Sequence, residues 1–213
     1  MNGLKKLIKF KNKKKFIYLI SPKKIKSNNF YKQLKKIFEL NKVAFFQLRL
    51  KKEKERKKLI ISKKIKKLCN KYKVRYIIND DPLLAKKINA DGCHLGQTDM
   101  NIVLARKVLK KHIIGITCHN SKKLIKKAIN NKANYIALGA FFTTKTKRVK
   151  YKASIKILNW CKKTTNIPIV SIGGIKSDNY KKLLLNKANF LAISSYIWNN
   201  KKYKPIEAIQ KIK

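Results

Sequence analysis

Short apolar runs alternate with segments of helical spacing along almost the whole chain, and this alternation limits the fold more than any other feature. Most of the runs are continuous, as expected of parallel strands that are buried on both faces. The expected strands lie at 16–21, 43–50, 74–80, 91–96, 112–118, 134–140, 167–175 and 190–197. The expected helices lie at 29–40, 53–71, 82–88, 100–110, 121–130, 154–163, 178–186 and 205–212. Eight successive strand–helix units predict an α/β fold that closes into a single (β/α)8 TIM barrel, with a doubly wound open sheet as the alternative.

The length of the chain fits one such barrel with a short basic segment in front of it. We expect residues 1–14 to form a flexible lead-in and residues 15–213 to form the barrel domain. The lead-in lacks the apolar run of a signal peptide, and no segment reaches the roughly 18 uninterrupted apolar residues of a membrane span. The four cysteines form no CxxC pair, so we expect reduced thiols in a cytoplasmic protein, without a zinc site or a disulfide framework.

The charge of the chain is extreme, with 56 Lys and Arg against 9 Asp and Glu and a net charge of +47. Such a charge attracts nucleic acid, membrane surfaces and phosphorylated metabolites alike. The excess is nearly all Lys, is accompanied by abundant Asn, and is spread through every expected helix. This diffuse pattern fits a genome biased toward Lys and Asn codons better than a selected nucleic-acid surface. We therefore expect small phosphorylated partners, with no specific nucleic acid and no membrane.

Acidic residues are scarce except in the segment 77–99, which holds four of the nine in the chain. These four are Asp80, Asp81, Asp91 and Asp99. Clustered carboxylates in so basic a chain suggest a hard cation such as Mg²⁺, which takes oxygen ligands and usually shares them with a substrate phosphate. A helix cap is the alternative for Asp80 or Asp81, because the Pro82 that follows suits the first position of a helix.

Polar residues gather where the expected strands end, and in a barrel of this type those ends form the active-site face. One set combines carboxylates with cations and suits a pyrophosphate: Arg49, Lys51, Asp80, Asp99 and Lys147. A second set offers hydroxyls and backbone amides to a phosphate: Thr144, Thr146, Gly173, Gly174, Ser194 and Ser195. The glycine pair could equally be a simple tight turn, and Lys51 a solvated charge. His119 fits a packed or loop histidine better than a catalytic base.

Six motifs stand in a fixed order along the chain: QLRLK at 47–51, NDD at 79–81, DGCHLGQTD at 91–99, GITCH at 115–119, GAFFTTKTK at 139–147 and IPIVSIGGI at 167–175. Together they resemble the thiamine phosphate synthase (thiamine-phosphate pyrophosphorylase) family, and the resemblance runs from about residue 16 to residue 197. Each motif alone is weak, whereas six in register are specific. The resemblance implies a TIM barrel that joins hydroxymethylpyrimidine diphosphate to thiazole phosphate in thiamine biosynthesis and releases pyrophosphate.

The resemblance also implies a role for each matching residue. The pyrimidine diphosphate would contact Gln47, Arg49, Lys51, Asn79, Thr117 and Lys147. The thiazole phosphate would contact Thr144, Thr146, Gly174, Ser194 and Ser195. Asp80 and Asp99 would bind Mg²⁺ as the cofactor, while Arg49, Lys147 and Thr117 would be the catalytic residues. The implied reaction passes through a pyrimidine carbocation that the thiazole nitrogen captures, so no protein nucleophile is required.

Two positions depart from the family pattern. Thr143 stands where the family often has Pro, and Tyr196 is bulkier than the usual aliphatic residue after the last strand. Two alternatives stay open. A barrel of the thiazole tautomerase type would share the fold and the thiazole phosphate pocket but lack the paired metal-binding carboxylates. A basic nucleic-acid-binding protein would need a localised patch. The oligomeric state, including a homo-oligomer, is also left open.

Overall fold

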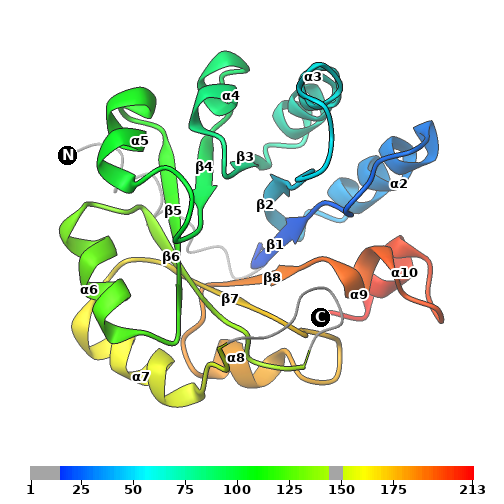
Figure 1. The fold of residues 1–213 in the computed structure, drawn as a ribbon. Coiled ribbons are helices and arrows are strands. Elements are labelled where there is room, and N and C mark those ends of the chain that lie inside the picture. Colours follow the sequence, from blue (N-terminus) through cyan, green and yellow to red (C-terminus); the bar gives the residue numbers. More distant parts are fainter. Residues whose placement is uncertain (1–14, 144–150) are drawn as a thin grey trace.

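The computed structural model describes residues 15–143 and 151–213 of the chain. Its eight strands are all parallel, each pairs with the next in sequence order, and β8 pairs with β1 to close the sheet. Figure 1 shows the strands at the centre of the molecule with the helices arranged around them. The closed barrel predicted from the alternation is therefore confirmed, and the open-sheet alternative is wrong.

The strands and helices alternate as expected from the apolar pattern. The strands are β1 Ile17–Ile20, β2 Val43–Leu48, β3 Arg75–Asn79, β4 Gly92–Leu95, β5 Ile113–His119, β6 Tyr135–Gly139, β7 Ile169–Ile172 and β8 Phe190–Ile193. The helices are α2 Asn28–Glu39, α3 Glu55–Lys71, α4 Pro82–Lys87, α5 Ile102–Leu109, α6 Lys122–Asn130, α7 Ile155–Thr164, α8 Lys181–Leu185, α9 Ser195–Trp198 and α10 Pro205–Gln210. None of these helices in the described ranges is long and apolar enough to cross a membrane.

The last two strands are shorter than the apolar runs suggested. The run 190–197 was expected to be one strand, but the chain leaves the sheet after Ile193 and turns into the short helix α9 at Ser195. The expected strand 167–175 ends at Ile172, because Gly173 and Gly174 adopt positive φ angles of 103° and 65°. These are left-handed conformations that an L side chain strains to adopt and that end the strand in a turn.

The core has two layers, because successive side chains of a strand point to opposite faces of the sheet. The layer inside the barrel is built from residues such as Tyr18, Phe45, Ile77, Tyr135, Val170 and Phe190. The layer between the strands and the helices includes Ile65 and Cys69, which confirms the buried stripe expected on α3. All four cysteines are free and buried.

Candidate active site

We call the polar end of the barrel, at the carboxyl ends of its strands, the mouth. It begins at the inward-facing residues that follow the apolar interior along each strand. Gln47 follows Phe45 by two residues on β2, and Asn79 follows Ile77 by two residues on β3, so both continue the inward face toward the carboxyl ends of the strands. The side-chain amide of Gln47 donates a hydrogen bond to the Oδ1 of Asn79. Gln47 is 3% exposed and Asn79 is partly buried, so this contact forms the floor of the mouth.

Cations and carboxylates meet at the rim, where the strands have ended. Lys51 lies in the turn after β2, and its Nζ is 2.7 Å from the Oδ2 of Asp80. Asp80 directly follows β3 with a left-handed backbone (φ 65°), and its N–H donates a hydrogen bond to the carbonyl of His94 at 2.8 Å. Asp is among the few residues that adopt this conformation readily. The backbone contact fixes Asp80 against the end of β4.

Asp99 lies beside Asp80 although nineteen positions of sequence separate them. Its Oδ2 accepts a hydrogen bond from the N–H of Gly96 at 2.7 Å. Burial raises the pKa of Asp99, and the neighbouring carboxyl of Asp80 raises it further, against the opposing effects of Gly96 and Lys51. A carboxylate whose ionisation is disfavoured by a neighbouring carboxyl gains from a bound cation.

The four acids of the segment 77–99 therefore do not act as one cluster. The side chain of Asp81 accepts a hydrogen bond from the N–H of Leu84 at 2.9 Å and caps α4, as the capping alternative predicted. Asp91 precedes β4 and so lies at the opposite end of the barrel from the mouth. There it accepts a hydrogen bond from the N–H of Tyr76 at 2.9 Å and pairs with Arg75. Asp91 is a structural residue, and only Asp80 and Asp99 belong to the mouth.

Thr117 completes this half of the mouth from β5. Its hydroxyl lies 2.8 Å from the Nε2 of His94 on the neighbouring strand β4. Its backbone carbonyl accepts a hydrogen bond of 2.5 Å from the side chain of Gln97. Burial lowers the pKa of His94 to about 4, with Arg49 adding to this effect and Asp99 opposing it. His94 is therefore neutral at pH 7. His119 packs its ring in a tilted arrangement against that of Tyr151, with a centroid distance of 4.5 Å.

The other half of the mouth is formed after β6, β7 and β8. The N–H of Phe142 donates to the carbonyl of Gly173 at 3.0 Å, so the segment after β6 runs beside the glycine turn. A Cβ at Gly174 would lie 2.4 Å from the carbonyl oxygen of Thr143, so only glycine fits there. This contact brings the chain to Thr143, next to the expected phosphate-binding residues. Thr144, Thr146 and Lys147 themselves lie outside the described residues.

Ser21, at the end of β1, connects the two halves of the mouth. Its hydroxyl accepts a hydrogen bond from the N–H of Arg49 at 2.9 Å. Its carbonyl accepts a hydrogen bond from the hydroxyl of Ser194 at 3.1 Å. Ser195 is the next residue and the first of α9. Ser21 thus holds Arg49 and Ser194 at the same edge of the barrel. The sequence had indicated only that Ser21 ends a strand.

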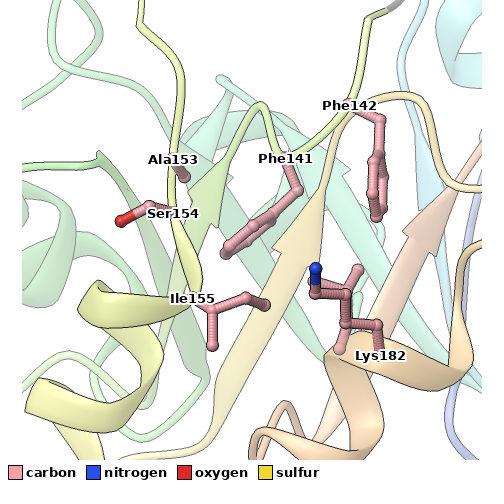
Figure 2. A pocket seen from close by; sticks show the side chains of 7 residues that line it. Phe141, Phe142, Ala153, Ser154, Ile155 and Lys182 are labelled. Atoms are coloured by element: carbon pink, nitrogen blue, oxygen red, sulfur yellow. The ribbon is translucent and has the colours of Figure 1, made fainter.

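A hollow of about 230 Å³ lies behind the segment that follows β6. Figure 2 shows Phe141 and Phe142 on one side of it, with Ile155 at the start of α7 and Lys182 of α8 on the other. None of the residues that line it was predicted to bind substrate or metal. Two of its lining residues, Phe141 and Phe142, belong to the segment that follows β6.

Sequence reasoning missed Ser21, His94 and Tyr135. His94 stands in a quoted motif but was given no role, although alternation from Gly92 would have placed it on the inward face. Tyr135 was counted only as part of an apolar strand, and its hydroxyl in fact lies 2.9 Å from the Nδ1 of His94. The signal for both was a polar atom at an inward strand position.

Comparison with families and relatives gives a consistent result. The family model described as thiamine monophosphate synthase matches residues 17–197. A thiamine-phosphate synthase of Pelagibacter ubique is 68% identical over 200 residues, which cover 94% of this chain and 97% of that protein. A thiamine-phosphate synthase of Erythrobacter litoralis is 34% identical and covers 90% of this chain and 92% of its own length.

Solved structures agree with the sequence relatives. A thiamine phosphate pyrophosphorylase from Pyrococcus furiosus superposes with a TM-score of 0.82 at 25% identity, covering 95% of each chain. A geranylgeranylglyceryl phosphate synthase from Thermoplasma acidophilum superposes with a TM-score of 0.69 at 15% identity, and this match shows the fold alone.

Proposed function

The chain belongs to the thiamine monophosphate synthase family, and from this membership we propose how the residues of its barrel mouth share the work of the reaction. The chain is a transferase enzyme that joins hydroxymethylpyrimidine diphosphate to thiazole phosphate and releases pyrophosphate, a step of thiamine biosynthesis. The observation that carries this function is the 68% identity to a thiamine-phosphate synthase over 94% of the chain.

In this proposal, the first half of the mouth holds the pyrimidine diphosphate. Gln47 and Asn79 already hold each other in place at the floor, where paired amides can read the polar edge of a ring. Arg49 and Lys51 stand above them at the rim, where a diphosphate would extend toward solvent. Thr117 closes the pocket from β5. The Gln47–Asn79 contact supports this assignment, because two amides that hold each other are preorganised before the substrate arrives.

Asp80 and Asp99 are the proposed ligands of Mg²⁺. They fit this ion, because the carboxyl of Asp80 raises the pKa of Asp99, and a cation between them would offset this repulsion. Mg²⁺ is typically held by one or two carboxylates together with waters and substrate phosphates. The described residues hold no group of three or more His, Cys, Asp or Glu that could bind a metal, so an all-protein cage is not present among them. When bound, Mg²⁺ neutralises charge on the departing pyrophosphate. Lys51 keeps Asp80 oriented and adds a positive charge beside it.

The second half of the mouth is proposed to bind the thiazole phosphate. The contributing residues are Thr144, Thr146, Gly174, Ser194 and Ser195. The left-handed Gly174 lets the turn pack against Thr143, and the Ser194–Ser21 hydrogen bond sets the serine pair at the same edge. Phosphate sites after the seventh and eighth strands are common in barrels of this type. Lys147 is proposed to reach the pyrophosphate from the loop after β6.

Catalysis in this proposal relies on charge and placement. Arg49 and Lys147 offset the negative charge that builds on the departing pyrophosphate, and Thr117 orients the pyrimidine. The two halves of the mouth would hold the thiazole nitrogen against the pyrimidine carbon from which pyrophosphate departs. The C–O bond to pyrophosphate breaks, the C–N bond to thiazole forms, and no side chain becomes covalently attached.

The direct test is to incubate the purified protein with both precursors and Mg²⁺ and to measure thiamine phosphate and pyrophosphate. We expect both products in equal amounts, and their loss on addition of EDTA. Full activity in EDTA would exclude the metal role. Absence of product with both precursors present would favour a barrel of the thiazole tautomerase type.

The proposal assigns no specific nucleic-acid partner to the +47 charge. Incidental charge predicts weak RNA binding that collapses as salt rises, because binding then depends on counterion release alone. A salt titration of RNA binding checks this, and tight selective binding at physiological salt would contradict it. We also propose a cytoplasmic location, because four free, buried cysteines suit a reducing compartment.

A further inference from the structure

Four polar groups form a continuous hydrogen-bonded chain from the interior of the barrel to its mouth. The hydroxyl of Tyr18 lies 2.7 Å from that of Tyr135. The hydroxyl of Tyr135 lies 2.9 Å from the Nδ1 of His94, and the Nε2 of His94 lies 2.8 Å from the hydroxyl of Thr117. We call these four residues the relay. It connects strands β1, β6, β4 and β5 across the inside of the barrel.

The interior is shaped to hold the relay. Tyr18 and Tyr135 are each 1% exposed and pack against Phe45. A Cβ at Gly115 would lie 1.9 Å from the Cζ of Tyr135, so the missing side chain at this position provides the space for the phenol ring. A polar chain placed in such a desolvated interior costs free energy unless each donor finds an acceptor.

The direction of the hydrogen bonds follows from counting donors. The ring of His94 lies between the hydroxyls of Tyr135 and Thr117, and burial of this kind disfavours the charged imidazolium, so the neutral ring carries one N–H. In one direction Tyr18 donates to Tyr135, Tyr135 donates to Nδ1, and the Nε2–H donates to Thr117. In the other direction every bond is reversed, and the hydroxyl proton of Tyr18 has no acceptor among the described residues. A buried donor without an acceptor costs about 1–3 kcal/mol, so the first direction is favoured.

We propose that the relay holds His94 as its Nε2–H tautomer and thereby forces the hydroxyl of Thr117 to donate its own proton outward, to a ring nitrogen of the pyrimidine substrate. Thr117 accepts from His94 and keeps its proton for the ligand. His94, Tyr135 and Tyr18 are then positioning residues that act through Thr117. The inference rests on the proposed function for the identity of the ligand, but the tautomer of His94 does not depend on it.

The tautomer can be read directly in the substrate-free protein. The chain has three histidines, so ¹⁵N-labelled histidine gives few signals, and the His94→Asn variant identifies those of His94. We expect Nε2 to appear as the protonated nitrogen and Nδ1 as the unprotonated one near pH 7. The opposite assignment in the wild-type protein would overturn the proposal, whether or not the enzyme is active.

Kinetics test the consequence for the substrate. Tyr135→Phe keeps the ring but removes the donor to Nδ1, so we expect a mixture of His94 tautomers. The KM for the pyrimidine diphosphate should rise about three- to tenfold, the size of one lost hydrogen bond, while the KM for the thiazole phosphate stays unchanged. Tyr76→Phe is the matched control, because it removes a buried tyrosine hydroxyl that lies in the layer between the strands and the helices, outside the relay.

Substitution of Thr117 separates its hydroxyl from its shape. Thr117→Ser keeps the hydroxyl and should retain a KM for the pyrimidine diphosphate within about threefold of wild type, whereas Thr117→Val should raise it by about tenfold. Equal effects of the two substitutions, or equal changes in both KM values for Tyr135→Phe, would contradict the proposal. A wild-type enzyme without activity would instead refute the proposed function, and the tautomer measurement would still decide the relay.

Discussion

The Nζ of Lys51 lies 2.7 Å from the Oδ2 of Asp80, so a cation and a carboxylate of the barrel mouth are a contact pair. Both side chains reach solvent, with 52% and 25% of their surfaces exposed, and exposed pairs contribute little to folding. In the proposed mechanism, the pair would fix the carboxylate before substrate and metal arrive.

Replacing Lys51 should therefore affect the reaction more than the fold. We expect Lys51→Gln to lower kcat/KM for the pyrimidine diphosphate by about tenfold or more, through loss of a fixed charge at the diphosphate. The melting temperature should be nearly unchanged. Lys52→Gln, at the next and equally exposed position, is the control that keeps the overall charge equal. Equal losses in the two variants would show that only net charge matters.

Gly96 leaves the space that the carboxylate of Asp99 occupies, so a side chain at this position should disturb the proposed metal site. A Cβ there would lie 2.9 Å from the Oδ2 of Asp99, so Gly96→Ala should push this carboxylate aside without changing its chemistry. We expect the Mg²⁺ concentration for half-maximal rate to rise several-fold while the protein stays folded. A Mg²⁺ titration of turnover, with circular dichroism as the folding control, measures this. An unchanged titration would show that Asp99 does not bind the metal in this position.

Asp91 should matter for stability and not for turnover. Burial alone would raise its pKa, but the N–H of Tyr76 and the charges of Lys66 and Arg75 hold the pKa below its ordinary value. The stability that ionised Asp91 gains from these contacts is complete above the pKa of Asp in the unfolded chain, which is about 3.9. It is lost as the pH falls through the lower pKa of Asp91 in the folded protein. We expect Asp91→Asn to cost about 2 kcal/mol at pH 7 and to flatten the stability curve on its acid side. Denaturant melts across pH test this, and loss of turnover in the still folded variant would contradict it.

The loop after β6 carries two lysines that should differ. The family resemblance places Lys147 at the pyrophosphate, whereas Lys145 stands between two threonines assigned to the thiazole phosphate. If this segment is extended, the side chain of Lys145 would point away from them to solvent. Lys147→Ala should lower kcat by about a hundredfold, and Lys145→Ala by much less. Steady-state turnover of the two variants decides this, because equal effects would contradict the placement of Lys147.

Much of the barrel was predictable, because continuous apolar runs and helical spacing are local properties of the sequence. The strand predicted at 190–197 was too long, because the apolar run continues to Ile197 although the chain becomes helical at Ser195. Alternation cannot show where a strand leaves a closed sheet. That end depends on the neighbouring strand, here β1, which pairs with β8 only as far as Ile193.

The site was predictable in part. The capping role of Asp81 follows from its place before Pro82, whereas the structural role of Asp91 depends on Arg75 and Lys66 from other segments. The relay was not predictable, since it requires His94 to meet a hydroxyl 41 positions further along the chain. Such contacts arise from the closure of the barrel and leave no local pattern.

The most direct test of the account compares Asp80, Asp81 and Asp99 in one experiment. Each is replaced by Asn, and turnover to thiamine phosphate is measured against Mg²⁺ concentration. Asp81→Asn should stay close to wild type, because Asn caps a helix about as well as Asp. Asp80→Asn and Asp99→Asn should remain folded but lose about 3 kcal/mol of transition-state stabilisation, roughly a hundredfold in rate, and need more Mg²⁺. A crippled Asp81→Asn beside an Asp80→Asn with normal rate and metal dependence would show that the carboxylates at the barrel mouth have been assigned wrongly.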